Sequence, residues 1–348
     1  MPARIMTSKA FQSRFGSKLP IVCPPMAGVA GGRLAAAVHK AGGFGYIGAG
    51  HKPFDTLVED VRLAKETLSL SPNDDLPVGV GFMGWKFEPP QLEKETGIND
   101  GERWLAYIIH EAKARSVWIS FANDLKAWVD RARAIEKAGS NGASTRKEKL
   151  LIAIMVHSAA KAKEALSWKN VDAVVLQGTE AGGHGADSEH GAPLDELLDA
   201  VLGDTSMSSD SRPLILAAGG ISSPAAVAKY LGREGVAAVV PGTALCVADE
   251  STLSDPQKKL LVDAQDGASG TARSVRWDIA RGTTGWPVGV DGRGLRDAVS
   301  ESSGEVQKGG PPVTWAGTGV GDVTKTGPVA DILQHLASEY RGETEAGV

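Results

Sequence analysis

Cysteine is scarce in this sequence, which contains only Cys23 and Cys246 among its 348 residues. Two cysteines are too few for the disulfide framework of a small secreted protein, so we expect a reducing compartment, the cytoplasm. Neither cysteine lies beside an obvious activating base. We therefore expect both to pack as small hydrophobic side chains, without a catalytic role.

Long apolar runs and an excess of positive charge are also missing. No apolar run approaches the length of a membrane span, so no membrane partner is expected. The formal net charge is -5, and scattered basic residues give no reason to expect nucleic acid as a partner. The first twenty residues are basic and lack acids, as in a mitochondrial transit peptide. They run directly into the first predicted strand, however, and are expected to belong to the fold.

Short apolar runs alternate along the chain with segments of helical spacing that are rich in alanine, lysine and glutamate. This alternation is typical of a parallel sheet with crossover helices, whose strands are buried on both faces. Eight such runs in a chain of this size predict an α/β fold, a (β/α)8 TIM barrel. The predicted strands span residues 21–27, 44–48, 78–82, 117–121, 151–157, 173–176, 214–217 and 237–240.

Residues 251–320, between the last strand and the last predicted helix, show no clear strand periodicity. We interpret them as an inserted lid or small second domain over the carboxyl-terminal face of the barrel, which residues 1–250 and 321–348 would form. Within the insertion, the polar run "SESSGEVQKGGPP" at 300–312 could instead be disordered. Trp85, after the third strand, could line a substrate pocket or pack beneath the insertion.

Glycine-rich segments follow six of the predicted strands, at the face where the loops of a TIM barrel build the active site. After strands seven and eight, the backbone N–H groups of Gly219, Gly220, Gly242 and Thr243 could converge on a phosphate, beside a helix that starts near residues 222–224. Close packing at the strand ends is the alternative. No dinucleotide fingerprint follows a strand, so a mononucleotide is expected.

His184 stands within the segment "LQGTEAGGHGAD" at residues 176–187. Glycine lets the backbone approach a ligand closely, and histidine suits proton transfer near neutral pH. A solvated histidine in a loop is the alternative. His157, at the end of strand five, could face the same site or be hydrogen-bonded within the barrel, whereas His51 and His190 are expected in exposed loops. His184 and His190 lack a third ligand, so no metal is expected.

Four segments in this order resemble the nitronate monooxygenase family, formerly called 2-nitropropane dioxygenases: "PPMAGVAGG", "QGTEAGGHGAD", "LAAGGIS" and "PGTALCVADES". The resemblance covers residues 17–336. It implies a TIM barrel that binds flavin mononucleotide (FMN) and oxidises alkyl nitronates with dioxygen, giving a carbonyl compound and nitrite. Neutral nitroalkanes are further candidate substrates, and an oligomer is possible, although the sequence leaves the oligomeric state open.

The resemblance also implies roles for particular residues. His184 would be the catalytic base, Met26 and Ala27 would line the isoalloxazine ring, and Gly183 would lie beside it. Gly219, Gly220, Gly242 and Thr243 would hold the phosphate, and the cofactor-binding set is completed by Gly28, Gln177 and Gly182. Two positions depart from the family pattern. Pro241 replaces a methionine and Gly81 an asparagine, so the pocket shape and the subclass stay open.

Other classes of protein share parts of this pattern. A flavin-dependent enoyl-(acyl carrier protein) reductase has the same barrel and glycine–histidine loop, but requires a reduced nicotinamide. A barrel of the inosine monophosphate dehydrogenase type shares the "AAGGI" loop, but needs a nucleophilic cysteine after strand six, which this chain lacks there. A flavin-binding protein without catalytic activity is the remaining alternative.

Overall fold

The computed structural model describes residues 3–50, 53–88, 100–139, 146–203, 212–301, 309 and 313–341. His51 and most of the polar run at 300–312 lie outside the described residues. No helix in these ranges is both long enough and apolar enough to span a lipid bilayer.

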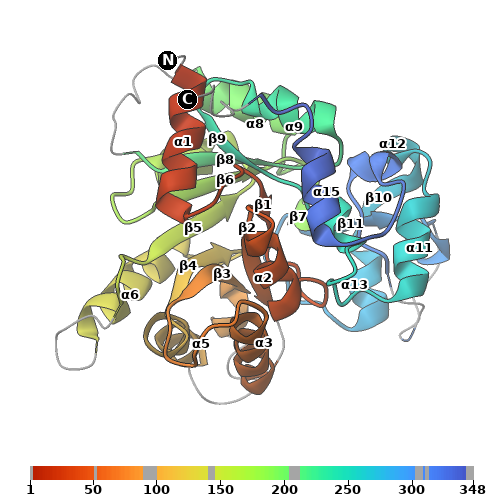
Figure 1. The fold of residues 1–348 in the computed structure, drawn as a ribbon. Helices are drawn as coiled ribbons and strands as arrows, with labels where there is room; N and C mark the ends of the chain where they lie inside the picture. The colour runs from red at the N-terminus through yellow and green to blue at the C-terminus, as the bar shows by residue number, and fades with distance from the viewer. Residues whose placement is uncertain are drawn as a thin grey trace.

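Eight parallel strands form the central sheet, in the spatial order β1-β2-β3-β4-β5-β6-β8-β9 (Figure 1). A parallel bridge between Ile21 and Val239 joins the two edges of the sheet. The sheet therefore closes into the predicted (β/α)8 barrel. Its strands are β1 (Val22–Cys23), β2 (Phe44–Gly50), β3 (Leu76–Met83), β4 (Ala114–Ser120), β5 (Leu151–Val156), β6 (Ala173–Gln177), β8 (Leu214–Ala218) and β9 (Val236–Val240).

The apolar runs form strands because each one is covered on both faces. Every residue of β2, β5, β8 and β9 is buried, as expected where helices surround a parallel sheet. The predicted first strand was too long, since β1 ends at Cys23. Pro24 and Pro25 follow it, and proline has no backbone N–H to donate to a neighbouring strand.

Helices form between the barrel strands and surround them, as the alternating segments of helical spacing predicted. Several begin at a side-chain cap that satisfies a free backbone N–H: Asp124 accepts from Ala127, and Ser158 accepts from Lys161. The crossover helices and the last helix are α2 (Gly32–Lys40), α3 (Phe54–Thr67), α5 (Asp100–Ala106) with a following π-helical turn (Tyr107–Glu111), α6 (Leu125–Ala138), α7 (Ala159–Leu166), α8 (Leu194–Leu202), α9 (Pro224–Leu231) and α15 (Val329–Leu336).

The amino-terminal helix α1 (Ala3–Phe15) contributes side chains to the barrel interior. Phe11 and Phe15 are fully buried or nearly so, and Phe15 meets Phe44 edge-on with ring centroids 4.9 Å apart. Phe44 contacts Tyr46, and Tyr46 contacts Trp118, each with centroids 5.1 Å apart. Because Phe44 is the first residue of β2, α1 closes the amino-terminal end of the barrel.

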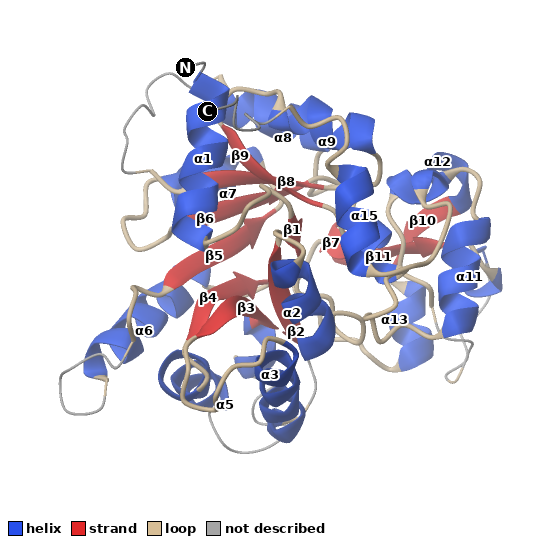
Figure 2. Cartoon of the chain, viewed as in Figure 1, coloured by secondary structure: helices blue, strands red, loops and turns tan. Residues whose placement is uncertain are grey.

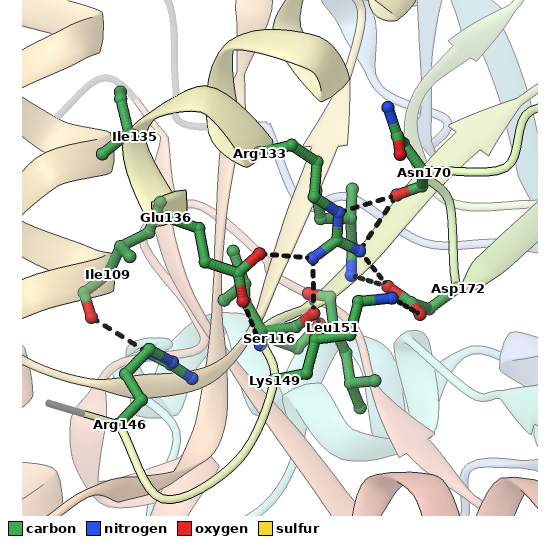
Figure 3. Close-up of polar contacts among 12 residues, drawn as sticks. Ile109, Ser116, Arg133, Ile135, Glu136, Arg146, Lys149, Leu151, Asn170 and Asp172 are labelled. Carbon is green, nitrogen blue, oxygen red and sulfur yellow. Dashed lines mark hydrogen bonds and ion pairs between the residues drawn. The ribbon is translucent and has the colours of Figure 1, made fainter. Parts of the chain in front are cut away.

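A buried ion cluster also lies at the amino-terminal ends of the strands (Figure 3). Arg133 of α6 donates hydrogen bonds to the Glu136 carboxylate at 2.7 Å and to the Leu150 carbonyl at 2.8 Å. It also binds the Asn170 carbonyl and the Asp172 carboxylate. Since these groups precede β5 and β6, they lie away from the face that carries active sites in this fold, and their role is structural.

A second, antiparallel sheet has the order β10-β11-β7 and lies to the right of the barrel strands in Figure 2. This sheet corrects two expectations. The glycine-rich segment around His184 was expected among the loops, but residues 183–186 form β7, and the region 251–320, which shows no strand periodicity, contains two strands. Its strands carry glycine and arginine, as in "VDGRGL", so they lack alternating apolar residues. The elements are β7 (Gly183–Ala186), β10 (Thr271–Ser274) and β11 (Val290–Leu295), with α10 (Thr243–Cys246), α11 (Asp255–Asp263), α12 (Gly267–Gly270), α13 (Arg276–Arg281), α14 (Ala298–Glu301) and the 3₁₀ segments Gly84–Phe87 and Thr318–Asp322.

Candidate active site

A cavity of about 540 Å³ lies at the carboxyl ends of the barrel strands. Its walls come from the ends of the strands, from the segments after them, and from residues 253, 257, 281–284, 286, 313 and 315. All the site residues predicted from the sequence line it together: Met26, Ala27, Gly28, Gln177, Gly182, Gly183, His184, Gly219, Gly220, Gly242 and Thr243.

The segments after β8 and β9 form one side of the cavity. Gly219 and Gly220 have φ angles of +124° and +67°, a backbone conformation that favours glycine. They lead into α9, where the Ser223 side chain accepts a hydrogen bond from a backbone N–H of the first turn. The Thr243 hydroxyl accepts a hydrogen bond from the Gly317 N–H at 3.0 Å. Its own proton stays available, because a hydroxyl both donates and accepts.

Three other glycines on the wall serve different purposes. Gly28 and Gly183 have φ angles of +77° and +72°, and a Cβ on either would meet no atom within 4 Å. They leave open space beside the backbone. A Cβ on Gly182 would instead lie 2.5 Å from the backbone of residues 316 and 317, so close packing explains that glycine.

His184 is held by residues of the inserted segment. Its Nε2 atom lies 3.0 Å from both carboxylate oxygens of Asp278 on α13. Its ring stacks on Trp286, with centroids 3.6 Å apart and planes 13° apart, and contacts Trp315 at 4.9 Å. The side chains of His184 and Asp278 are 11% and 6% exposed, which excludes a solvated loop histidine.

Sequence reasoning missed Asp278, Trp286 and Trp315 as site residues. The available signal was an aspartate and several tryptophans within a glycine- and arginine-rich insertion expected over the barrel face. The pairing of His184 with Gly292 between β7 and β11, and the position of α13, bring these residues to the histidine. Neither feature follows from local sequence.

Two arginines fix the segment before β7. Arg273 of β10 donates to the Asp291 carboxylate at 2.6 Å and to the carbonyls of Thr179 and Ala181 at 3.3 and 3.4 Å. Arg293 donates to the Thr179 carbonyl at 2.9 Å. Burial raises the pKa of Asp291, whereas the positive charge of Arg273 opposes this increase. The small sheet thus binds the glycine-rich segment through its carbonyl groups.

His157, directly after β5, is partly buried, with both ring nitrogens shielded from solvent, and its ring stacks on Phe121 with centroids 5.3 Å apart. Burial, with a contribution from the charge of Arg273, lowers its pKa to about 4; the Gln177 amide acts in the opposite direction. In the described part of the chain, neither ring nitrogen of His157 nor the Oε1 atom of Gln177 has a hydrogen bond of normal geometry. His157 is therefore a neutral imidazole beside Phe121 and Gln177, two residues of the cavity wall, and it lacks the hydrogen bond expected of a structural histidine.

Two other residues considered from the sequence, His190 and Trp85, differ in their relation to the cavity. His190 receives no contact from His184; its Nδ1 atom lies 2.8 Å from Asp187, which raises the His190 pKa. Trp85 is 3% exposed, lines the cavity and contacts Trp286 at a tilt of 49°, with ring centroids 5.1 Å apart. It therefore combines the two roles considered for it.

The two cysteines are buried and unpaired. Burial raises the pKa of Cys246 to about 12, and it raises the pKa of Cys23 further, with a contribution from the neighbouring Cys246. Cys246 lines the cavity and lies 3.7 Å from the sulfur of Met26. Thiols with such raised pKa values stay protonated and are poor nucleophiles, which agrees with packing as small hydrophobic groups.

The chain shows similarity to known proteins along most of its length. A model of the nitronate monooxygenase family matches residues 9–284. The nitronate monooxygenase npaC of Metarhizium robertsii is 29% identical to this chain over an aligned length of 353 residues, gaps included. The alignment covers 92% of this chain and 90% of that protein.

Two solved structures share the fold. A nitroalkane oxidase from Streptomyces ansochromogenes has a TM-score of 0.68 at 22% identity and covers 95% of this chain and 97% of its own. FabK from Thermotoga maritima has a TM-score of 0.69 at 20% identity and covers 95% of this chain and 96% of its own. These two structural similarities establish the barrel fold, but they do not show which of the two proteins' reactions this chain shares. The match of the family model over most of the residues decides the matter: the chain belongs to the nitronate monooxygenase family, whose members are flavin-dependent oxidoreductases that oxidise nitronates.

Proposed function

We propose that this protein binds FMN in the cavity and uses dioxygen to oxidise alkyl nitronates to a carbonyl compound and nitrite, with His184 as the base for neutral nitroalkanes. The observation that carries this proposal is the convergence of His184 and the glycine-rich segments on one cavity of about 540 Å³. A volume of this order is typical of cavities that bind small ligands.

The residues present fit a flavin mononucleotide. Open space beside Gly28 and Gly183 would let a flat ring approach the backbone. The Oε1 atom of Gln177 is buried without a hydrogen bond among the described residues, as expected of a group whose partner is a ligand. Gly219 and Gly220 precede the start of α9, where backbone N–H groups and the helix dipole favour a phosphate.

Further residues would complete the flavin site. Gly242 and Thr243 would contribute to the phosphate site from the segment after β9, and Met26, Ala27 and Gly182 would line the ring. When bound, FMN would supply the electron transfer from the nitronate to dioxygen that side chains cannot perform. These residues bind and orient the flavin, and the protein surrounds it with apolar walls.

His184 would act before oxidation, on substrates that still carry a proton. A nitronate is already ionised and needs only to be oriented, whereas a neutral nitroalkane must first lose its α-proton. A histidine positioned beside the substrate is suited to that step. Trp286 and Trp315, which contact His184, would exclude water from the site.

We also propose that residues 251–320 form a lid over a barrel made of residues 1–250 and 321–348. This division is supported by the cavity wall, to which residues 281–286 contribute. A cytoplasmic location is supported by the two cysteines, which are buried and form no disulfide.

The purified protein should be yellow, and heat should release FMN, identified by mass. Oxygen uptake with an alkyl nitronate should need no added nicotinamide and should release nitrite. Recovery of FAD, or absence of flavin after reconstitution, would contradict the cofactor proposal. Rapid reduction of the flavin by NADH or NADPH, without oxygen uptake on nitronate, would instead favour the enoyl reductase alternative.

A further inference from the structure

We propose that Asp278 is a positioning residue that keeps the proton of neutral His184 on Nε2, so that Nδ1 is the atom that takes the substrate proton. This inference rests on the proposed role of His184 as a base. It adds the base's orienting partner and the identity of the reacting nitrogen.

The contact between the two side chains defines the tautomer. Nε2 of His184 lies 3.0 Å from both Oδ1 and Oδ2 of Asp278. An ionised carboxylate has no proton to donate and only accepts hydrogen bonds, so Nε2 must carry the proton. Nδ1 then keeps a free lone pair. It has no hydrogen-bond partner in the described part of the chain and is not sealed from solvent, and its residue lines the cavity.

The carboxylate is itself fixed in place. The Thr283 hydroxyl donates to Asp278 Oδ1 at 2.8 Å, and the Thr283 N–H donates to the Asp278 carbonyl at 2.9 Å. Gly282, with φ of +68°, ends α13 between them. Because that backbone conformation favours glycine, Gly282 permits the turn that brings Thr283 back to Asp278.

The ring of His184 is held by aromatic contacts as well. Trp286 stacks on it with planes 13° apart, and Trp315 contacts it at a tilt of 60°. A ring turned out of this plane would lose the stacking on Trp286, and a ring flipped within the plane would lose the hydrogen bond to Asp278. The combination of one bond and one stacked face therefore fixes both the orientation and the tautomer of the imidazole, as outer partners do for catalytic histidines in general.

The step that follows is a simple proton transfer. The α-carbon–hydrogen bond of the nitroalkane breaks, and its electron pair delocalises onto the nitro oxygens to give the nitronate. The proton forms a new bond to Nδ1, and the resulting imidazolium is balanced by the negative charge of Asp278. No oxidant or reductant takes part in this step.

The test compares Asp278→Asn with wild type on one compound supplied as nitroalkane and as pre-formed nitronate, at one pH and with equal flavin content. The amide of asparagine can donate to Nε2 and so favours the other tautomer. We expect turnover of the nitroalkane to fall by about 10²- to 10⁴-fold, and turnover of the nitronate to change by only a few fold.

The matched control is Asp187→Asn. Asp187 also bonds to a histidine, His190, at 2.8 Å, but that pair lies on the surface and does not touch His184. This variant should behave as wild type on both forms of the compound. If Asp278→Asn folds poorly, Thr283→Val can replace it, because this variant keeps the carboxylate and removes one hydrogen-bond donor to it. Turnover of the nitroalkane should again fall more than turnover of the nitronate, but by a smaller factor than in Asp278→Asn.

A second readout does not depend on turnover. ¹⁵N NMR of histidine-labelled protein, with the His184 signals assigned by their loss in His184→Asn, should show the Nε2–H tautomer in wild type and a shift toward Nδ1–H in Asp278→Asn. An Nδ1–H tautomer in wild type, or equal losses on both substrate forms in Asp278→Asn, would overturn the inference. Failure of wild type to oxidise any nitronate would overturn the proposed function, while the tautomer measurement still decides the role of Asp278.

Discussion

Trp286 covers one face of His184, with the two ring centroids 3.6 Å apart. The tryptophan belongs to the inserted segment and the histidine to β7. The orientation of the predicted base is therefore set by a residue about a hundred positions away in the chain.

Trp286→Ala should impair catalysis without loss of the flavin. Stacking of two rings contributes about 0.5–1.5 kcal/mol, so removal should lower turnover of nitroalkane by up to about tenfold as the imidazole gains freedom. Trp286→Phe keeps a ring in place and should retain most of the activity. Steady-state oxygen uptake measures both variants. Equal activity of the alanine and phenylalanine variants would show that stacking does not orient His184.

His184→Asn separates base catalysis from substrate positioning. Turnover of neutral nitroalkane should fall by about 10²- to 10⁴-fold, the usual contribution of a general base, whereas turnover of the pre-formed nitronate should fall much less. FMN should remain bound, as measured by its absorbance after gel filtration. Equal losses on the two forms would assign His184 to substrate positioning alone.

Gly183→Ala should weaken flavin binding, since its Cβ would project into the open space of the cavity. Gly16→Ala is the matched control, because Gly16 has a similar φ of +69° and equally open surroundings but does not line the cavity. Both variants should lose about 1 kcal/mol of stability from the strained backbone. Titration of apoprotein with FMN should show a raised Kd for Gly183→Ala only. An unchanged Kd would argue against the proposed flavin position.

Arg133→Met should lower the free energy of unfolding by about 3–5 kcal/mol, because it removes the buried cation that bridges the largely buried carboxylates of Glu136 and Asp172 and leaves Asp172 with Lys149 alone. Arg62→Met is the control, since Arg62 pairs with Glu59 on an exposed helix surface, and such pairs contribute at most about 1 kcal/mol. Urea unfolding measures both variants. Similar losses in the two would mean that the cluster at the amino-terminal end of the barrel adds little stability.

The lowered pKa of His157 predicts a stability loss in mild acid. Above pH 6.5 the imidazole is neutral in both the folded and the unfolded chain. Between pH 6.5 and about 4 only the unfolded chain takes up the proton, so stability falls as the pH falls, by up to roughly 3 kcal/mol.

His157→Leu should remove this part of the pH dependence. His190→Asn is the control of opposite sign, because the raised pKa of His190 gives stability that is lost as the pH rises. Urea unfolding at a series of pH values measures each slope. An unchanged slope in His157→Leu would mean that the imidazole takes up its proton over the same pH range in the folded and the unfolded chain.

The amino-acid sequence alone was enough to predict the barrel and most of the cavity wall. Buried apolar runs such as "VAAVV" and "LILAA" have one stable environment, a parallel sheet covered on both faces. A closed barrel of such strands must also gather the segments at their carboxyl ends into one place. That geometric constraint explains why glycines as distant in sequence as Gly28 and Gly242 line one cavity.

The surroundings of His184, in contrast, could not be predicted from the sequence, because they depend on tertiary packing. The strands β7 and β11 are short and rich in glycine, so their residues carry no apolar alternation and form strands only because they pair with each other. That pairing and the docking of α13 set Asp278 against Nε2 and Trp286 against the ring. The residues next to His184 in the sequence do not predict these contacts, because Asp278 and Trp286 lie about a hundred residues further along the chain and reach His184 only through long-range packing.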